Sequence, residues 1–130
     1  MSDISRPEDA GLADGKLRPC PDLPNCVCSE YPGKDHSIEP LNFSGGAGAA
    51  WARLISMLND QPRTTIVEQT EDYIHARVRT RILRFEDVLE FRLDRAAGQI
   101  HMRSASQVGY SDLGTNRRRV EALRNLFCDS

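Results

Sequence analysis

The residues best suited to chemistry lie near the end of the chain, in the stretch RSASQVGYSDLGTNRRR from Arg103 to Arg119. The stretch runs from a predicted strand through a polar turn with two glycines into a predicted helix. Arg117, Arg118 and Arg119 fall in the first turn of that helix, whose free N–H groups already carry partial positive charge. We therefore expect an anionic group, from the protein or from a ligand, to offset the three arginines.

Further polar residues could complete such a site. His75 and Arg77 share one face of a predicted strand, and His101 and Arg103 share a face of another. If the two faces coincide, they form a cationic patch with Arg117 at its rim. Asp112, just before the helix, is interpreted as the partner of the arginines that follow. The predicted anion site comprises Arg103, Ser104, Ser106, Tyr110, Asp112, Asn116, Arg117, His75 and Arg77.

We expect a non-catalytic binding or accessory domain that accepts a small anionic ligand or an acidic protein partner at this corner. One alternative is a small enzyme in which His75 or His101 forms an acid–base pair with Asp87 or Asp112. Another is a purely structural module, in which the corner only holds a strand to a helix. A row of arginines on a strand is also often a solvated face, paired here with Glu86, Glu90 and Asp94 on a neighbouring strand.

The four cysteines allow three interpretations. Cys20, Cys26 and Cys28 have the spacing C-x5-C-x-C, which differs from the paired short spacings of zinc sites and argues against a metal, even with His36 or Cys128 as a further ligand. A disulfide between Cys20 and Cys26 would close a tight loop that holds two prolines. Reduced, partly buried thiols are the alternative, because cytosolic cysteines are normally kept reduced.

Composition limits the class of protein. The 130 residues are 39% hydrophobic and 28% charged, which is typical of one soluble domain with a single core. The net charge of −2 argues against nucleic-acid binding, and the short apolar runs argue against a membrane span. Met1 to Lys16 is polar and has no apolar core like that of a signal peptide, so the chain as written is predicted to be cytoplasmic. Export or membrane association is the alternative if a longer chain was trimmed. We expect no cofactor and no metal.

The hydrophobic pattern predicts an α+β fold. Residues 65–69, 73–81, 85–94 and 99–106 alternate with period two, which predicts an antiparallel meander of about four strands. Residues 81–84 contain no turn residue, so the second and third strands could be one long bent strand. Apolar residues at i, i+3 and i+4 predict helices over 47–58, with Ser44 as a cap, and from 115 or 116 to 127.

Both helices are expected on one face of the sheet, with the arginine row on the other face. Residues 1–16 are predicted to be a flexible arm, and residues 17–130 a single domain that begins with an irregular Cys/Pro-rich segment.

The chain resembles the family known as domain of unknown function 1499. Two motifs carry the resemblance, Pro19-Cys20-Pro21 through Cys26-Val27-Cys28-Ser29 and the stretch from Arg103 to Arg119, and the weaker segment from Arg84 to Phe91 also fits. The family more often has arginine at the position of Gln107 and serine at that of Cys28. Its members often carry export or membrane-anchoring segments, which would suit a disulfide, but the resemblance implies no activity, substrate or catalytic residue.

Overall fold

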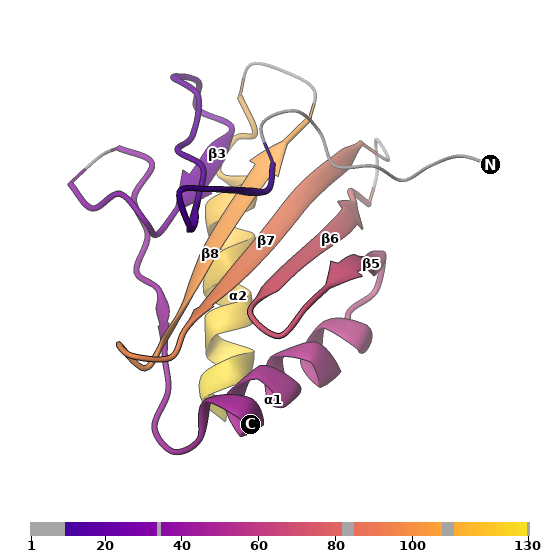
Figure 1. Cartoon of the computed structure of the whole chain (residues 1–130). Coiled ribbons are helices and arrows are strands. Elements are labelled where there is room, and N and C mark those ends of the chain that lie inside the picture. The colour runs from indigo at the N-terminus through magenta and orange to yellow at the C-terminus, as the bar shows by residue number, and fades with distance from the viewer. Residues whose placement is uncertain (1–9, 34, 82–84, 108–110, 130) are drawn as a thin grey trace.

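The computed structural model describes residues 10–33, 35–81, 85–107 and 111–129 (Figure 1). Its helices are α1 (Ala47–Asn59) and α2 (Thr115–Asp129). Its strands are β1 (Leu12–Ala13), β2 (Lys16–Leu17), β3 (Cys26–Cys28), β4 (Leu41–Asn42), β5 (Thr64–Gln69), β6 (Tyr73–Arg79), β7 (Glu86–Asp94) and β8 (Gln99–Ser106).

An antiparallel sheet forms the centre of the molecule, in the order β3-β8-β7-β6-β5, and β4 also pairs with β8. The predicted α+β class and the four-strand meander are confirmed as β5 to β8. The two further strands of this sheet, β3 and β4, were not predicted, because strands of three and two residues are too short to show a period. β6 ends at Arg79 and β7 begins at Glu86, so these are two strands rather than one long bent strand.

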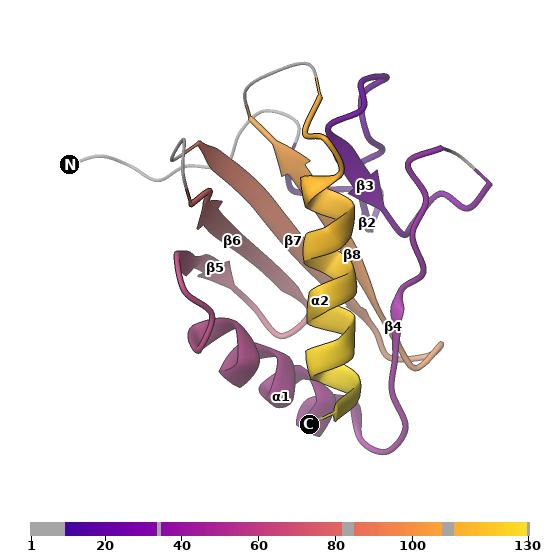
Figure 2. The ribbon, with the colours of Figure 1, turned by 180° about the vertical axis from the view of Figure 1, so that it is seen from behind.

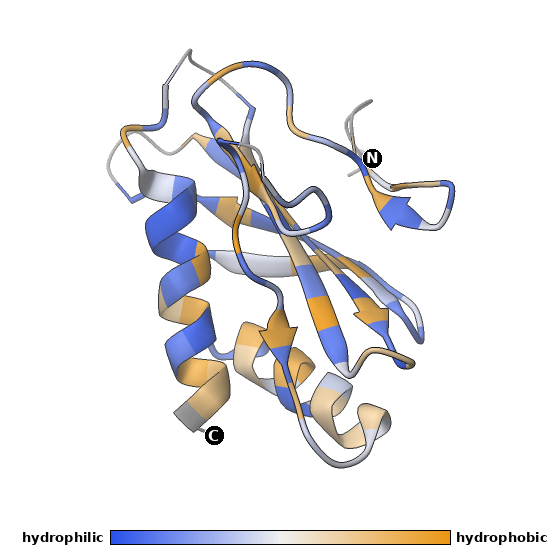
Figure 3. Cartoon of the chain, turned by 90° about the vertical axis from the view of Figure 1, so that its left-hand side faces the viewer, coloured by the Kyte–Doolittle hydropathy of each residue, from blue (hydrophilic) through white to orange (hydrophobic). Residues whose placement is uncertain are grey.

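Both helices cover the same face of the sheet, as predicted (Figure 2). We call this the helix face. It carries the apolar set of each central strand, such as Ile74, Leu89 and Met102, which pack with Trp51 of α1 and Phe127 of α2 in the main core. Blue and orange bands alternate along α2 in Figure 3, as expected for a helix with one apolar stripe. The two helices approach each other near the end of α2 and diverge toward its start (Figure 2).

The opposite face, which we call the N-terminal face, is covered by the start of the described chain. β1 and β2 form a small hairpin whose Leu17 is fully buried against Tyr73 and Cys28. The indigo segment crosses in front of β8 in Figure 1. The predicted flexible arm, residues 1–16, remains a prediction for residues 1–9, which lie outside the described residues; from Leu12 onward the chain is paired.

One local prediction is wrong. α1 is preceded by Gly46 in an extended conformation, without a side-chain hydrogen bond, so Ser44 does not cap it.

Candidate functional site

The start of α2 is organised by Asp112. Its carboxylate accepts hydrogen bonds from the backbone N–H of Gly114, at 2.8 Å, and of Asn116, at 3.1 Å, and from the Asn116 side chain. These N–H groups belong to a helix start, where they would otherwise lack partners. In the described part of the chain, no arginine lies within ion-pair distance of Asp112. The interpretation of Asp112 as the arginines' partner is therefore wrong, because the helix start itself occupies the carboxylate.

Asn116 is the centre of a buried hydrogen-bond network and is fully shielded from solvent. Its Nδ2 group donates to the carbonyl oxygen of Asn25 at 3.1 Å and to the Ser106 hydroxyl at 2.9 Å. Its Oδ1 accepts from the Ser104 hydroxyl at 2.6 Å and from Arg119 at 2.8 Å. The network ties α2 to the end of β8 and to the chain before β3.

Arg119 is the one of the three consecutive arginines that turns inward to a carboxylate. Its Nη2 lies 2.8 Å from Oδ2 of Asp87, which is buried on the helix face of β7. Burial raises the pKa of Asp87, and the charge of Arg119 opposes that shift. Asp87 and Arg119 therefore form a mostly buried ion pair between the sheet and α2.

Arg117 and Arg118 remain exposed and are held by oxygen atoms without formal charge. Arg117 donates to the carbonyl oxygens of Ser37 and Asp35, both at 3.1 Å. Arg118 donates to the carbonyl oxygen of Leu113 at 2.9 Å. Within the described residues, neither forms an ion pair, so their positive charges are solvated rather than neutralised.

Arg103 lies on the N-terminal face and is fully buried. Its Nη1 lies 3.4 Å from Oε1 of Glu90, which is also fully buried, and its Nη2 donates to the carbonyl oxygen of Pro19 at 3.3 Å. The other oxygen of Glu90 accepts from the Tyr73 hydroxyl and from the backbone N–H of Gly11. The charge of Arg103 is thus neutralised inside the protein.

A second ion pair on this face joins Glu30 to Arg92, whose Nε and Nη2 groups each donate to one carboxylate oxygen. Burial opposes ionisation of Glu30, but the hydrogen bond from Arg92 and the neighbouring His101 outweigh it, so the pKa of Glu30 is lowered. Burial lowers the pKa of His101, although Glu30 acts against it. The Ser29 hydroxyl accepts a hydrogen bond from the backbone N–H of Met102 and is hydrogen-bonded to Nδ1 of His101 at 2.8 Å.

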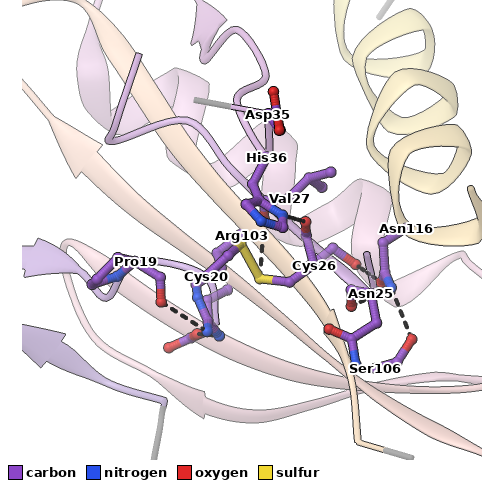
Figure 4. Close-up of a disulfide and its surroundings, with 12 residues drawn as sticks. Pro19, Cys20, Asn25, Cys26, Val27, Asp35, His36, Arg103, Ser106 and Asn116 are labelled. Carbon is purple, nitrogen blue, oxygen red and sulfur yellow. Dashed lines mark hydrogen bonds and ion pairs between the residues drawn. A yellow bond between two sulfur atoms is a disulfide. The ribbon is translucent and has the colours of Figure 1, made fainter. Parts of the chain in front are cut away.

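Cys20 and Cys26 form a disulfide with a Cα–Cα distance of 5.7 Å, which confirms the predicted pairing (Figure 4). It lies beside both motifs: Pro19 accepts from Arg103, and Asn25 accepts from Asn116. Cys28 is a buried thiol next to this bond, and burial raises its pKa to about 11.

The nine residues of the predicted site do not come together. Arg103, His75 and Arg77 lie on the N-terminal face of the sheet. Nε of Arg77 lies 3.9 Å from Oε2 of Glu86 on the neighbouring strand. Ser104, Ser106, Asp112 and Asn116 lie on the helix side in one network. Arg117 is exposed at the edge of α2, and Tyr110 lies outside the described residues.

The predicted acid–base pairs are also separated by the sheet. His75 and His101 lie on the N-terminal face, whereas Asp87 and Asp112 lie on the helix side. The predicted pairing of the arginine row with acids of the next strand is confirmed for Glu86, which binds Arg79 at 2.7 Å.

Two pockets flank the start of α2. The first, of about 240 Å³, lies beside the disulfide and is lined by Arg117 and His36, but also by Asp35 and Asp112. The second, of about 310 Å³, lies in the wedge between the diverging helices. Its described lining contains four arginines, Arg63, Arg79, Arg81 and Arg119, and no Asp or Glu. We call this second pocket the arginine groove.

Comparison with protein families gives one match. The model of the family described as "Protein of unknown function (DUF1499)" matches residues 16–127, which is most of the chain. The chain belongs to this family. No curated protein and no solved structure matches the chain. The two motifs that carried the resemblance form the disulfide loop and the corner joined through Asn116.

Two findings bear on cofactors and membranes. The described residues contain no group of three or more His, Cys, Asp or Glu side chains able to hold a metal ion. None of the helices described is both long enough and apolar enough to span a bilayer.

The sequence contained a signal for one contact that was not predicted, the ion pair of Asp87 with Arg119. Asp87 stands alone among the apolar residues of its face in β7, which marks a buried carboxylate in need of a cationic partner. Arg63 had no such signal, because it reaches the arginine groove from a loop between α1 and β5.

Proposed function

We propose that this protein is a non-catalytic binding domain whose anion site is the arginine groove. One observation carries the proposal: the groove gathers arginines from the α1–β5 loop, the end of β6 and α2, while no acidic residue of the described chain lines it. Anions are attracted to such a concave surface, where guanidinium groups can donate two parallel hydrogen bonds to a carboxylate or phosphate.

The four arginines differ in how much charge they leave for a ligand. Arg119 is paired with Asp87 and Arg79 with Glu86. Arg63 and Arg81 are exposed, and neither forms an ion pair with any residue that the structure describes. We therefore propose that Arg63 and Arg81 supply the net positive charge that binds the anion. Arg119, held in place by Asp87, forms one side of the groove.

The pocket beside the disulfide is the weaker candidate for the same function. Arg117 and His36 favour an anion there, but Asp35 and Asp112 line the same space. A carboxylate beside an anion repels it, so we place the anion in the arginine groove.

The test is the thermal stability of the purified protein in inorganic phosphate, sulfate and citrate at constant ionic strength. A ligand at 100 times its dissociation constant stabilises a protein by about 2.7 kcal/mol. We expect at least one anion to raise the melting temperature of the wild type and not that of the Arg63→Asn/Arg81→Gln double variant. Arg63 has a positive φ of 58°, which asparagine tolerates, so the substitution should keep the loop conformation.

Arg95→Gln is the matched control, because Arg95 is exposed in a turn and does not line the groove. Arg117→Ala tests whether the anion binds in the pocket beside the disulfide instead, because Arg117 lines that pocket and not the arginine groove. An anion effect lost only in Arg117→Ala would move the site to the pocket beside the disulfide, and no effect of any anion would reject the proposal.

A further inference from the structure

The floor of the arginine groove is apolar. It is formed by Leu58 of α1, Val78 and Leu89 of the sheet, and Ala122 and Leu123 of α2. Leu58 and Leu89 are almost fully shielded from solvent, whereas Val78 and Leu123 keep 9% and 5% of their surface exposed, so the groove lies directly above the main core.

A groove with an apolar floor and cationic residues around it fits a ligand with two different ends. We propose that the ligand of this groove is a single-chain anionic amphiphile, with its acyl or alkyl chain on the apolar floor and its head group at Arg63 and Arg81. This inference rests on the proposed anion site and specifies its ligand class.

Two features favour a free molecule over a bilayer surface. The floor is recessed, because its lining residues Val78 and Leu123 are buried apart from a small exposed area, and a flat membrane surface would not reach them. The volume of about 310 Å³ is at the low end of small-ligand pockets, which span roughly 300–1,000 Å³. The chain is therefore expected to be short.

Charge and apolar area act on different parts of the ligand. The head group alone covers little of the apolar floor, so inorganic phosphate should bind weakly. Because this binding is electrostatic, its affinity should decrease as the salt concentration rises. Each methylene placed on the floor should tighten binding about fourfold, until the floor is covered.

The experiment compares inorganic phosphate, n-hexyl phosphate and 1-hexanol by isothermal titration calorimetry with the full chain, below the micelle concentration. We expect hexyl phosphate to bind at least tenfold more tightly than either the head or the tail alone. The Arg63→Asn/Arg81→Gln variant should lose the preference for hexyl phosphate over hexanol.

Ala122→Leu fills the floor from an exposed position of α2, where leucine is a good helix former. It should remove most of the gain from the hexyl chain and keep the binding of phosphate. Ala52→Leu, at an exposed position of α1 that does not line the groove, is the control and should change neither.

The outcomes separate this inference from the proposed function. If phosphate binds in the groove and the hexyl chain does not increase the affinity, the proposed anion site is supported and the proposed amphiphilic ligand is rejected. If no anion binds, both are wrong. If hexyl phosphate does not bind but anionic phosphatidylglycerol vesicles do, the surface recognises a membrane and the free amphiphile is rejected.

Discussion

Replacing Asn116 by alanine should destabilise the protein by about 3 kcal/mol. Asn116 is fully buried and bonds Asn25, Ser104, Ser106 and Asp112 through its amide. A typical hydrogen bond contributes about 1 kcal/mol, and a buried polar group left without a partner costs about 1–3 kcal/mol. The two serine hydroxyls lose the Asn116 partner, whereas the Asn25 carbonyl keeps the backbone N–H of Ser106.

Urea denaturation followed by far-UV circular dichroism measures this loss, as a lower midpoint at an unchanged slope. Asn125→Ala is the matched control, because Asn125 is an exposed residue of the same helix, and it should change stability by less than about 0.5 kcal/mol. A loss below 1 kcal/mol for Asn116→Ala would refute the reasoning, since the corner would then not depend on this network.

Three further predictions concern groups outside the groove. Folding lowers the pKa of His101, so the neutral imidazole favours the folded state. This contribution to the free energy of unfolding is present above pH 6.5, the ordinary pKa of histidine, and is lost as the pH falls through the folded pKa. Urea midpoints should therefore fall more steeply below pH 6.5 for the wild type than for His101→Gln, and parallel curves would contradict this. Iodoacetamide at pH 7.5 should modify Cys128, which is exposed, and spare Cys28, whose pKa is raised to about 11; mass spectrometry showing two labels on the native protein would contradict the burial of Cys28. Leu113 has a positive φ of 53° and is 84% exposed, so Leu113→Asn should stabilise the protein by about 0.5–1 kcal/mol in thermal unfolding, and a clear loss would show that its side chain packs.

The central elements could be predicted because their side chains repeat with a clear period. The alternation of Ile74, Ala76 and Val78 predicts which face of β6 packs against the helices. The spacing of Trp51 and Leu54 predicts the apolar side of α1. β3 and β4 have no such period. They exist because β8 offers its free edge to them, which is a tertiary property.

The candidate site was harder to predict, because the sheet separates residues that are adjacent in sequence. Arg103 and Ser104 are neighbours, yet one meets Glu90 on the N-terminal face and the other meets Asn116 on the helix side. Strand alternation alone implies this separation. Which of three consecutive arginines turns inward depends on the rotation of α2 about its axis, and that was not predicted.

The arginine groove could not be inferred from local sequence. Arg63, Arg81 and Arg119 lie in a loop, beyond a strand end and in a helix, and only the packing of α1 and α2 on the sheet brings them to one pocket. The sequence shows that positive charge is concentrated in two regions of the chain. It does not show that these two regions meet a third, the loop of Arg63, in the folded protein.

The most direct test of the anion site is a titration of the ¹⁵N-labelled protein with inorganic phosphate, followed by amide NMR spectra. The groove is lined by Thr64, Thr80 and Ala122, whereas Ser111 and Gly114 line the pocket beside the disulfide. We predict saturable shifts of the Thr64, Thr80 and Ala122 amides, which the Arg63→Asn/Arg81→Gln variant abolishes. Shifts confined to Ser111 and Gly114, or no saturable shift at all, would contradict the account.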